Sequence, residues 1–344
     1  MNNIIFTYVL IIITFYLINT LLIKKNLLID SFQVNTHKNL VNQKTVPISG
    51  GILLVCVILF LFKDTSIINK FLFFLIFFLG FLSDTKKLSS PTYRLIVQIF
   101  ISGLYVFIND FYAVETQIYY FDQLLNNYLF VKLFFTVFCI LILINGTNFI
   151  DGVNTLASGY FLVVIINILL INHLYGLEAD FLNISYIFSF LIIFFIFNFF
   201  SKSFLGDGGS YLLGFLLGIY LINYNIINKD ISPYYIILIL WYPAFENLFT
   251  IFRRIFYDKK KVKNPDNLHL HQLIFIYLNK KFSKKKHLNT LTGVLINTFN
   301  FMVFFIGSFY IYSSYKILVI LLFLVISYLI IYFLLRKFYN NTNI

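Results

Sequence analysis

The fold is decided by an uncharged run at residues 317–335, which reads ILVILLFLVISYLIIYFLL. Residues 71–82, FLFFLIFFLGFL, form a second run that is apolar on every face. A helix of about 20 apolar residues spans a bilayer, because it satisfies its own backbone hydrogen bonds in hydrocarbon. Strands of a membrane barrel would be ~10 residues long and would alternate in polarity. Both runs therefore predict transmembrane helices.

The rest of the chain has the same character. Of the 344 residues, 60% are hydrophobic and 12% are charged, whereas a soluble domain carries roughly 25% charged residues. Both cysteines lie in apolar runs, which favours packing over a disulfide or a zinc site. No small-residue cleavage site follows the N-terminal apolar run at residues 4–23. We predict an all-α polytopic transmembrane helix bundle that forms one integral membrane domain over residues 1–344. Its eleven expected helices cover residues 4–23, 48–62, 68–83, 94–109, 128–145, 156–172, 183–200, 208–222, 233–251, 291–312 and 317–335.

The basic residues indicate how this bundle is oriented. With the N-terminus outside, the inside loops and the C-terminus hold 21 of the 26 Lys and Arg residues, and the outside loops hold 5. The 14 acids divide equally between the two sides. An excess of basic residues marks the cytoplasmic side of a membrane protein. We therefore expect the N-terminus outside, the C-terminus in the cytoplasm, and residues 252–290 as the longest cytoplasmic loop.

Five polar segments fall on this cytoplasmic side. Three of them place a carboxylate at a predicted helix end, namely Asp84, Asp151 and Asp207. A charged group near hydrocarbon is costly and is a candidate functional residue. One such residue could simply cap a helix, but three on one face favour a common site. The segments are TVPISGG at 45–51, GFLSD at 80–84, NGTNFIDG at 145–152, FLGDGGS at 204–210 and NPDNLHLHQ at 264–272.

These residue types suit the transfer of a phosphoryl group. Mg²⁺ binds carboxylate oxygens and usually bridges to substrate phosphates, and cationic side chains stabilise phosphate oxygens. Asn148 and Asp151 are three residues apart and share a face if that segment is helical. Gly206 and the glycines after it let the backbone approach a phosphate, although no Gly-Lys-Ser/Thr follows as in a P-loop. The pattern predicts magnesium-assisted phosphoryl transfer at the membrane surface, with a lipid phosphate as one substrate.

In this order, the five segments resemble those of the polyprenyl-phosphate N-acetylhexosamine-1-phosphate transferases of glycosyl transferase family 4, over residues 30–275. The resemblance implies that a UDP-sugar gives its sugar 1-phosphate to polyprenyl (undecaprenyl) phosphate and that UMP is released. It also implies Mg²⁺, or Mn²⁺ in its place, as the cofactor. By position it assigns Asp207 and Asn148 to the metal, Asp84, Asp151, His269 and His271 to catalysis, and Lys44, Asn148 and Gly206 to cofactor and phosphate binding.

Three positions depart from the family pattern. Ser83 replaces the first residue of the usual Asp-Asp pair, so only Asp84 is expected to serve as a carboxylate base. Asn154 replaces the second Asp of the usual Asp-Gly-x-Asp-Gly-Leu, and Gln272 replaces a frequent third histidine. The Val-Pro-x-x-Gly-Gly form of the first segment favours the branch that initiates cell-surface polysaccharides of the O-antigen type. The phospho-N-acetylmuramoyl-pentapeptide transferases of peptidoglycan synthesis stay an alternative.

A membrane transporter or lipid flippase is the alternative from another class. Such proteins place polar residues near the bilayer midplane in matched halves, whereas the middles of these helices are apolar and no half-repeat is visible. The basic loop at 252–290 could bind anionic headgroups or, as we expect, cover the active site. The expected partners are the UDP-sugar, polyprenyl phosphate and the lipid bilayer, with a homodimer left open and no nucleic acid. The expected location is the bacterial inner membrane, with the active site on the cytoplasmic side.

Overall fold

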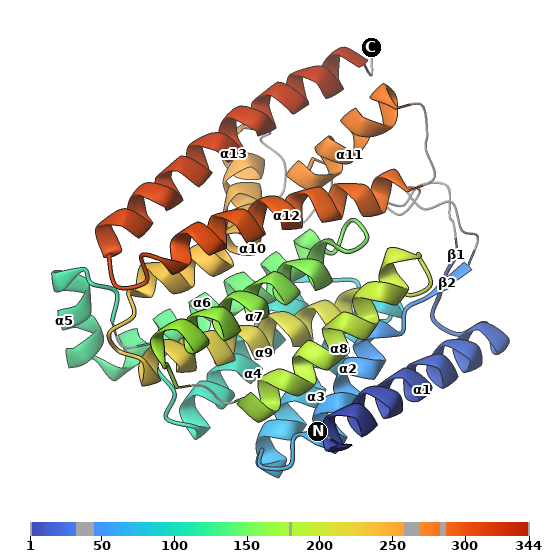
Figure 1. Ribbon diagram of the computed structural model, residues 1–344, viewed down its shortest axis with the longest axis horizontal. Helices are drawn as coiled ribbons and strands as arrows, with labels where there is room; N and C mark the ends of the chain where they lie inside the picture. Colours follow the sequence, from blue (N-terminus) through green and yellow to red (C-terminus); the bar gives the residue numbers. More distant parts are fainter. Residues whose placement is uncertain are drawn as a thin grey trace.

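The structure is a computed structural model that describes residues 2–31, 45–113, 115–178, 181–257, 268–282 and 287–342. Within these ranges the chain forms thirteen α-helices and one small sheet (Figure 1). The first seven helices are α1 Asn2–Lys24, α2 Gly50–Leu61, α3 Ile67–Asp84, α4 Pro91–Ile108, α5 Tyr119–Asn127, α6 Leu129–Ile150 and α7 Leu156–Tyr175. The others are α8 Phe181–Phe199, α9 Gly206–Ile227, α10 Pro233–Phe252, α11 Leu270–Lys281, α12 Leu288–Ser308 and α13 Ser314–Thr342, and the π-helical turn Arg253–Tyr257 continues α10.

The length and composition of the helices match a membrane protein. In the described residues, eight helices are long and apolar enough to cross a membrane, and α1, α2 and α8 contribute shorter apolar helices. Each of the eleven predicted helices overlaps one of these. Large apolar side chains face outward, as on α13, where Leu322 is 61% exposed and Phe323 is 62% exposed. Such surfaces suit contact with lipid. The all-α polytopic membrane fold is confirmed.

Two described helices were not predicted. Helix α5 precedes α6 directly, and α11 lies within the 252–290 segment that was expected to be a loop. The buried residues Leu270, Leu273 and Phe275 lie on α11, which packs against α12 and α13. Both helices are too short to span a bilayer, so a search for membrane-spanning apolar runs did not detect them.

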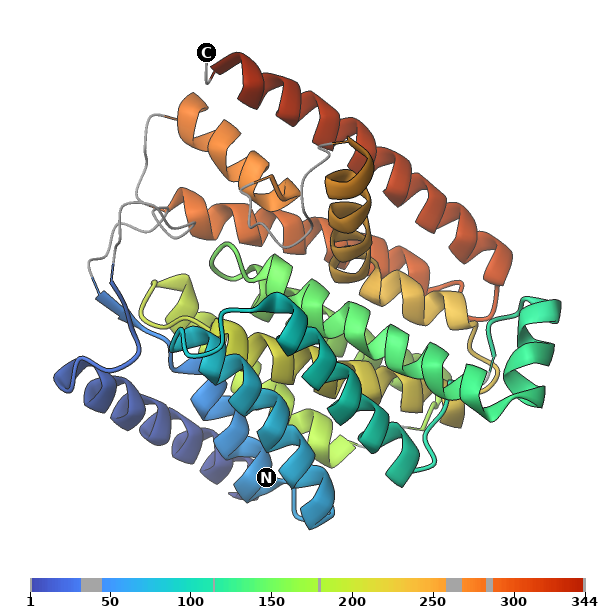
Figure 2. The ribbon, with the colours of Figure 1, turned by 180° about the vertical axis from the view of Figure 1, so that it is seen from behind.

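Helix α9 lies inside the bundle and packs against α2, α3 and α6 (Figure 1, Figure 2). Glycines let these backbones come close, as small residues do where membrane helices pack together. A Cβ on Gly51 would lie 2.5 Å from the Gly209 nitrogen, and one on Gly214 would lie 2.7 Å from the Leu143 carbonyl oxygen. The first turn of α9 is thereby fixed between its neighbours.

Helix α10 contains a proline in its interior, at Pro243. Proline has no N–H to donate, so the carbonyl four residues earlier, on Ile239, loses its helical partner. The Tyr160 hydroxyl of α7 donates to that carbonyl at 2.9 Å. The same hydroxyl oxygen accepts from the Tyr242 backbone N–H at 3.4 Å. A neighbouring helix thus satisfies the group that the proline releases, and α10 changes direction partway along its length (Figure 2).

The sheet consists of two short antiparallel strands, β1 Ile29–Ser31 and β2 Thr45–Pro47. In their register, Ile29 pairs with Pro47 and Ser31 pairs with Thr45. The two strands lie at the same end of the bundle as α11 and the C-terminus (Figure 1). Strand β2 leads directly into the first polar segment of the candidate site.

Candidate active site

Two of the predicted motifs are joined by backbone hydrogen bonds. Ile48, just after β2, pairs with Phe204 in a parallel bridge. The N–H groups of Gly50 and Gly51 then donate to the carbonyls of Phe204 at 3.0 Å and Leu205 at 3.1 Å. The first and fourth polar segments, which are about 150 residues apart in sequence, thus form one ladder that leads into α9.

Gly206 begins α9 with a backbone that glycine alone adopts easily. Its φ is +76°, and an added Cβ would lie 2.3 Å from Ile48 Cγ2 and 2.8 Å from Asp84 Oδ2. Both the left-handed conformation and the close approach favour glycine. Asp207 follows in the first turn, where the unpaired N–H groups and the helix dipole make the surroundings electropositive.

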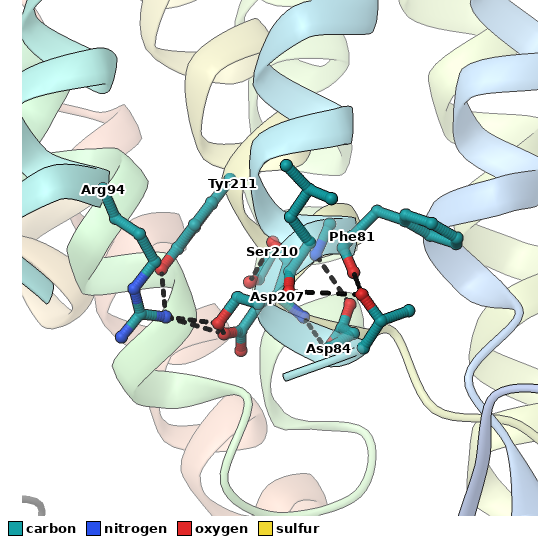
Figure 3. Close-up of polar contacts among 10 residues, drawn as sticks. Phe81, Asp84, Arg94, Asp207, Ser210 and Tyr211 are labelled. Carbon is teal, nitrogen blue, oxygen red and sulfur yellow. Dashed lines mark hydrogen bonds and ion pairs between the residues drawn. The ribbon is translucent and has the colours of Figure 1, made fainter. Parts of the chain in front are cut away.

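Asp84 is the last residue of α3, and its side chain caps the N-terminus of α9. Its Oδ1 accepts from the Asp207 backbone N–H at 2.9 Å, and its Oδ2 accepts from the Gly208 N–H at 3.1 Å (Figure 3). A carboxylate that accepts two of the N–H groups at a helix N-terminus stabilises that terminus. Asp84 therefore holds the start of α9 against α3, whatever further role it has with substrate.

The Asp207 side chain points to a cation on α4 (Figure 3). Its Oδ2 lies 3.0 Å from Arg94 Nη1 and accepts from the Ser83 hydroxyl at 2.6 Å. Arg94 Nη1 also donates to Ser83 Oγ at 2.6 Å and to the Tyr211 hydroxyl at 3.0 Å. The Arg94 and Asp207 side chains are 19% and 30% exposed. Ser83, at the position where the family usually has an Asp, is thus a neutral bridge between an arginine and a carboxylate.

Asn148 and Asp151 lie at the end of α6, which continues to Ile150 rather than ending near 145 as predicted. The Asn148 side chain lies near the Tyr211 hydroxyl, which Arg94 also contacts. Asp151 ends the helix, and its N–H donates to the Thr147 carbonyl at 3.2 Å. The helical segment therefore brings Asn148 to the Arg94–Asp207 pair, with Asp151 one turn further along.

Asn154 shows how the chain accommodates one departure from the family pattern. The side chain is buried, and its Nδ2 donates to Ser201 Oγ at 2.6 Å. Its backbone N–H donates to Asn289 Oδ1 at 2.6 Å. A buried amide with partners carries no charge to be neutralised. Asn154 thereby ties the segment after α6 to α12 and to the segment after α8.

The two histidines stand at the start of α11 with parallel rings, 5.6 Å apart and inclined by 14°. His269 Nδ1 lies 2.9 Å from Oε1 of Glu246 on α10, and its ring centroid is 5.0 Å from that of Phe149. Gln272, which replaces the family's third histidine, accepts from the His269 backbone N–H at 3.2 Å. The amide at this position therefore caps α11.

His271 is fully buried, and its two ring nitrogens have no hydrogen-bond partner among the described residues. Burial lowers the pKa of its imidazole to about 3, against a smaller opposing effect of the Glu246 carboxylate. A Cβ added to Gly152 would lie 2.4 Å from the Nε2 atom of His271. His271 is therefore neutral at physiological pH and packs the start of α11 against the residue that follows Asp151.

Two kinds of comparison with known proteins show what this chain is similar to. A family profile described as glycosyl transferase family 4 matches residues 66–225. The chain is 30% identical over 220 residues to a probable undecaprenyl-phosphate N-acetylglucosaminyl 1-phosphate transferase of Bacillus subtilis strain 168, covering 59% of this chain and 56% of that protein. It is 32% identical over 192 residues to a phospho-N-acetylmuramoyl-pentapeptide-transferase of Dictyoglomus turgidum, covering 53% of this chain and 60% of that protein. The match to glycosyl transferase family 4 covers just under half of this chain.

The family 4 profile covers Asp84, Asn148, Asp151 and Asp207, while the histidines lie beyond its end. The chain spans somewhat more than half the length of the two relatives that it matches. Of the other residues predicted for the site, Lys44 lies outside the described residues, as do 258–267 and 283–286 of the long loop. That this loop covers the site stays a prediction.

Sequence reasoning assigned no role to several residues that the structure brings to this candidate site. Arg94 and Tyr211 contact the predicted residues directly, and Glu246 contacts His269. For Glu246 a signal was present, because it is the one acid in an otherwise uncharged stretch at 233–252. An acid inside a membrane-spanning helix is a functional candidate by default.

The donor atoms suit a Mg²⁺ ion that is shared with substrate. Among the described residues, no three His, Cys, Asp or Glu side chains are grouped as an all-protein metal site. Mg²⁺ is commonly held by one or two carboxylates together with waters and substrate phosphates. Asp207 offers one partly exposed carboxylate, and Asn148 lies near the same Tyr211 hydroxyl, so these residues fit an ion whose other ligands come from a diphosphate.

Proposed function

We propose that this protein transfers an N-acetylhexosamine 1-phosphate from a UDP-sugar to polyprenyl phosphate at a membrane surface and releases UMP. The observation that carries the proposal is the group formed by Asp207, Arg94 and Asn148 at the N-terminus of α9, at one end of a membrane bundle. The names of both relatives support it, because each is a transferase of a phosphorylated N-acetylated sugar.

The proposed reaction is a phosphoryl transfer between two phosphates. An oxygen of polyprenyl phosphate attacks the sugar-bearing phosphorus of the UDP-sugar, and the bond from that phosphorus to the bridging oxygen breaks. The bridging oxygen leaves with UMP, and the lipid product carries a diphosphate. Both substrates are ionised near neutral pH, so the protein's task is to position them and to stabilise negative charge.

Different residues of the site position the substrates and stabilise their negative charge. Mg²⁺, or Mn²⁺, when bound at Asp207 and Asn148, supplies positive charge to the diphosphate oxygens. The Arg94 guanidinium, which Ser83 and Tyr211 hold beside Asp207, can donate to phosphate oxygens. Asp84 keeps the N-terminal N–H groups of α9 in place. Asp151 at the end of α6, and His269 at the start of α11 with its ring on Phe149 of α6, complete the proposed binding surface.

The proposed location is the inner membrane of a bacterium, with the site at the cytoplasmic surface. The distribution of basic residues supports this orientation, since 21 of 26 fall on the side that carries the polar segments. A polyprenyl chain dissolves in hydrocarbon, while a UDP-sugar arrives from water. A site at the ends of the helices is accessible to both.

The test measures UMP release by the purified protein in lipid nanodiscs, with undecaprenyl phosphate, Mg²⁺ and UDP-N-acetylglucosamine. Asp207→Asn should abolish transfer and leave the protein folded. Asp230→Asn is the matched control, because that acid is exposed in the segment between α9 and α10 and makes the same chemical change away from the site. Activity of Asp207→Asn near that of the control would contradict the proposal.

A second candidate is the transfer of phospho-N-acetylmuramoyl-pentapeptide, which the 32% identity to the Dictyoglomus turgidum protein supports. We favour a plain or modified 2-acetamido sugar because the first segment reads Val46-Pro47-Ile48-Ser49-Gly50-Gly51. Substrate choice depends on whether buried polar groups of the pocket find partners. The same assay, offered both UDP donors, distinguishes the two candidates. Preferential turnover of the pentapeptide donor would assign the chain to peptidoglycan synthesis rather than to a surface polysaccharide.

A further inference from the structure

Glu246 has a buried carboxylate with a different partner on each oxygen. The residue lies on α10 and is 1% exposed. Its Oε1 is 2.9 Å from His269 Nδ1 at the start of α11, and its Oε2 accepts from the Tyr328 hydroxyl of α13 at 2.7 Å. Residues from three separate elements therefore meet at one carboxylate.

The surroundings of this carboxylate are aromatic. The Tyr328 ring centroid is 4.9 Å from that of Phe245 and 5.3 Å from that of Phe249. Burying an unpaired carboxylate in such a place costs several kcal/mol, and hydrogen bonds to both oxygens offset that cost only in part. An apolar residue of similar volume would pack α10 against α13 equally well. Packing alone therefore does not account for an acid here.

The contact with His269 has a chemical consequence. A carboxylate accepts hydrogen bonds and donates none, so the proton of this pair lies on Nδ1. The neutral imidazole then has its lone pair on Nε2, whereas a neutral histidine in water prefers the proton on Nε2. A carboxylate that fixes the tautomer and ring orientation in this way also stabilises positive charge on the imidazole.

The place of His269 connects this pair to the proposed site. Its ring packs on Phe149, which lies between Asn148 and the helix end at Asp151, with centroids 5.0 Å apart. The Arg254 guanidinium is 5.9 Å from the centroid of the same Phe149 ring. His271 contrasts with His269, because neither of its ring nitrogens has a partner in the described part of the chain.

We propose that Glu246 is a positioning residue that acts through His269. It holds the proton on Nδ1, so that Nε2 is the nitrogen presented to the diphosphate of the UDP-sugar, and Tyr328 fixes the carboxylate. The proposal deepens the transferase function above and rests on it. It also gives α13, which lies beyond the family profile match at 66–225, a direct connection to the reaction.

The first test is kinetic and uses the intact protein in nanodiscs. Glu246→Met removes both hydrogen bonds at similar volume and should lower kcat about 10- to 100-fold, as is typical when a carboxylate that orients a functional histidine is lost. KM for polyprenyl phosphate should stay unchanged. Because Glu246 acts through His269, adding Glu246→Met to His269→Ala should cause no further loss. A second variant, Glu246→Gln, keeps a hydrogen-bond acceptor but loses the charge. Its matched control is Glu178→Gln, which makes the same change at an exposed acid between α7 and α8.

The second test reads the tautomer directly and does not depend on turnover. Protein labelled with ¹⁵N in its five histidine rings is measured by NMR at pH 8, with His269→Ala to assign the signal. We expect His269 to carry its proton on Nδ1 in the wild type and on Nε2 in Glu246→Met. Tyr328→Phe, which keeps the ring, should cause a smaller loss of kcat and serves if Glu246→Met does not fold.

The outcomes separate this proposal from the function on which it rests. If the wild type transfers neither donor, the transferase function fails, while the NMR measurement still reports the tautomer. An unchanged His269 tautomer in Glu246→Met would overturn the positioning role. Losses that add in the double variant would overturn it as well, because Glu246 would then act independently of His269.

Discussion

Replacing Gly80 by alanine should displace the start of α9, where Asp207 lies. A Cβ at this position of α3 would lie 2.4 Å from the carbonyl carbon and oxygen of Asp207 and 2.5 Å from Gly208 Cα. Ordinary contacts between such atoms are about 3.5 Å, so the two backbones would have to separate by ~1 Å. Overpacking of this kind typically costs about 1–3 kcal/mol of stability. A shift of ~1 Å in a reacting group can also lower turnover about 100-fold.

The matched control is Gly103→Ala on α4, where an added Cβ meets nothing within 4 Å. Alanine is favoured over glycine inside a helix by about 1 kcal/mol, so this variant should be as stable as the wild type or more so. The assay compares thermal unfolding in nanodiscs with UMP release for both variants. If Gly80→Ala melts and turns over like Gly103→Ala, the contact between α3 and α9 does not position Asp207, and the reasoning fails.

Three further predictions concern the polar network. Asp84→Ala should lower stability by about 1–2 kcal/mol through the lost cap and should reduce turnover more than Ser83→Ala; equal losses of UMP release would contradict this. Arg94→Lys should raise KM for the UDP-sugar, because one ammonium cannot keep the planar contacts of a guanidinium; an unchanged KM would remove Arg94 from the site. Since the pKa of His271 is about 3 when folded and ~6.5 when unfolded, the contribution of His271 to the free energy of unfolding should be constant above pH 6.5. It should then fall by about 1.4 kcal/mol per pH unit below that value, and unfolding at pH 8 and 5 should show a smaller difference for His271→Gln.

The helices could be predicted because long apolar runs have one stable form in hydrocarbon. The run at 71–82 lies within α3, Ile67–Asp84, as expected. The end of α6 was placed too early, near Asn145, because a polar residue there resembles a helix boundary. In the structure the Asn145 amide donates to Gln98 Oε1 on α4 at 2.9 Å and to the Leu141 carbonyl at 2.9 Å. The helix therefore continues past it.

The site could be predicted in part, because the distribution of Lys and Arg residues assigned its polar segments to one side of the membrane. The structure brings Asp207, Asn148 and Asp84 to the start of α9. The sequence does not reveal which carboxylate caps a helix and which faces an arginine, since both stand at helix ends. The contact between Glu246 and Tyr328 joins residues that are 82 apart in sequence. Such contacts depend on how α10 and α13 pack, which no local pattern encodes.

The contact between Tyr160 and the carbonyl of Ile239 has a consequence for how this chain can evolve. The Tyr160 hydroxyl is needed because Pro243 leaves that carbonyl without its helical donor. Phenylalanine at 160 would leave the Ile239 carbonyl oxygen without a hydrogen-bond donor in hydrocarbon. In a relative without the proline, the same exchange would destabilise the protein much less. The two positions should therefore have diverged as a pair, so that lineages that lost the proline were also free to lose the hydroxyl.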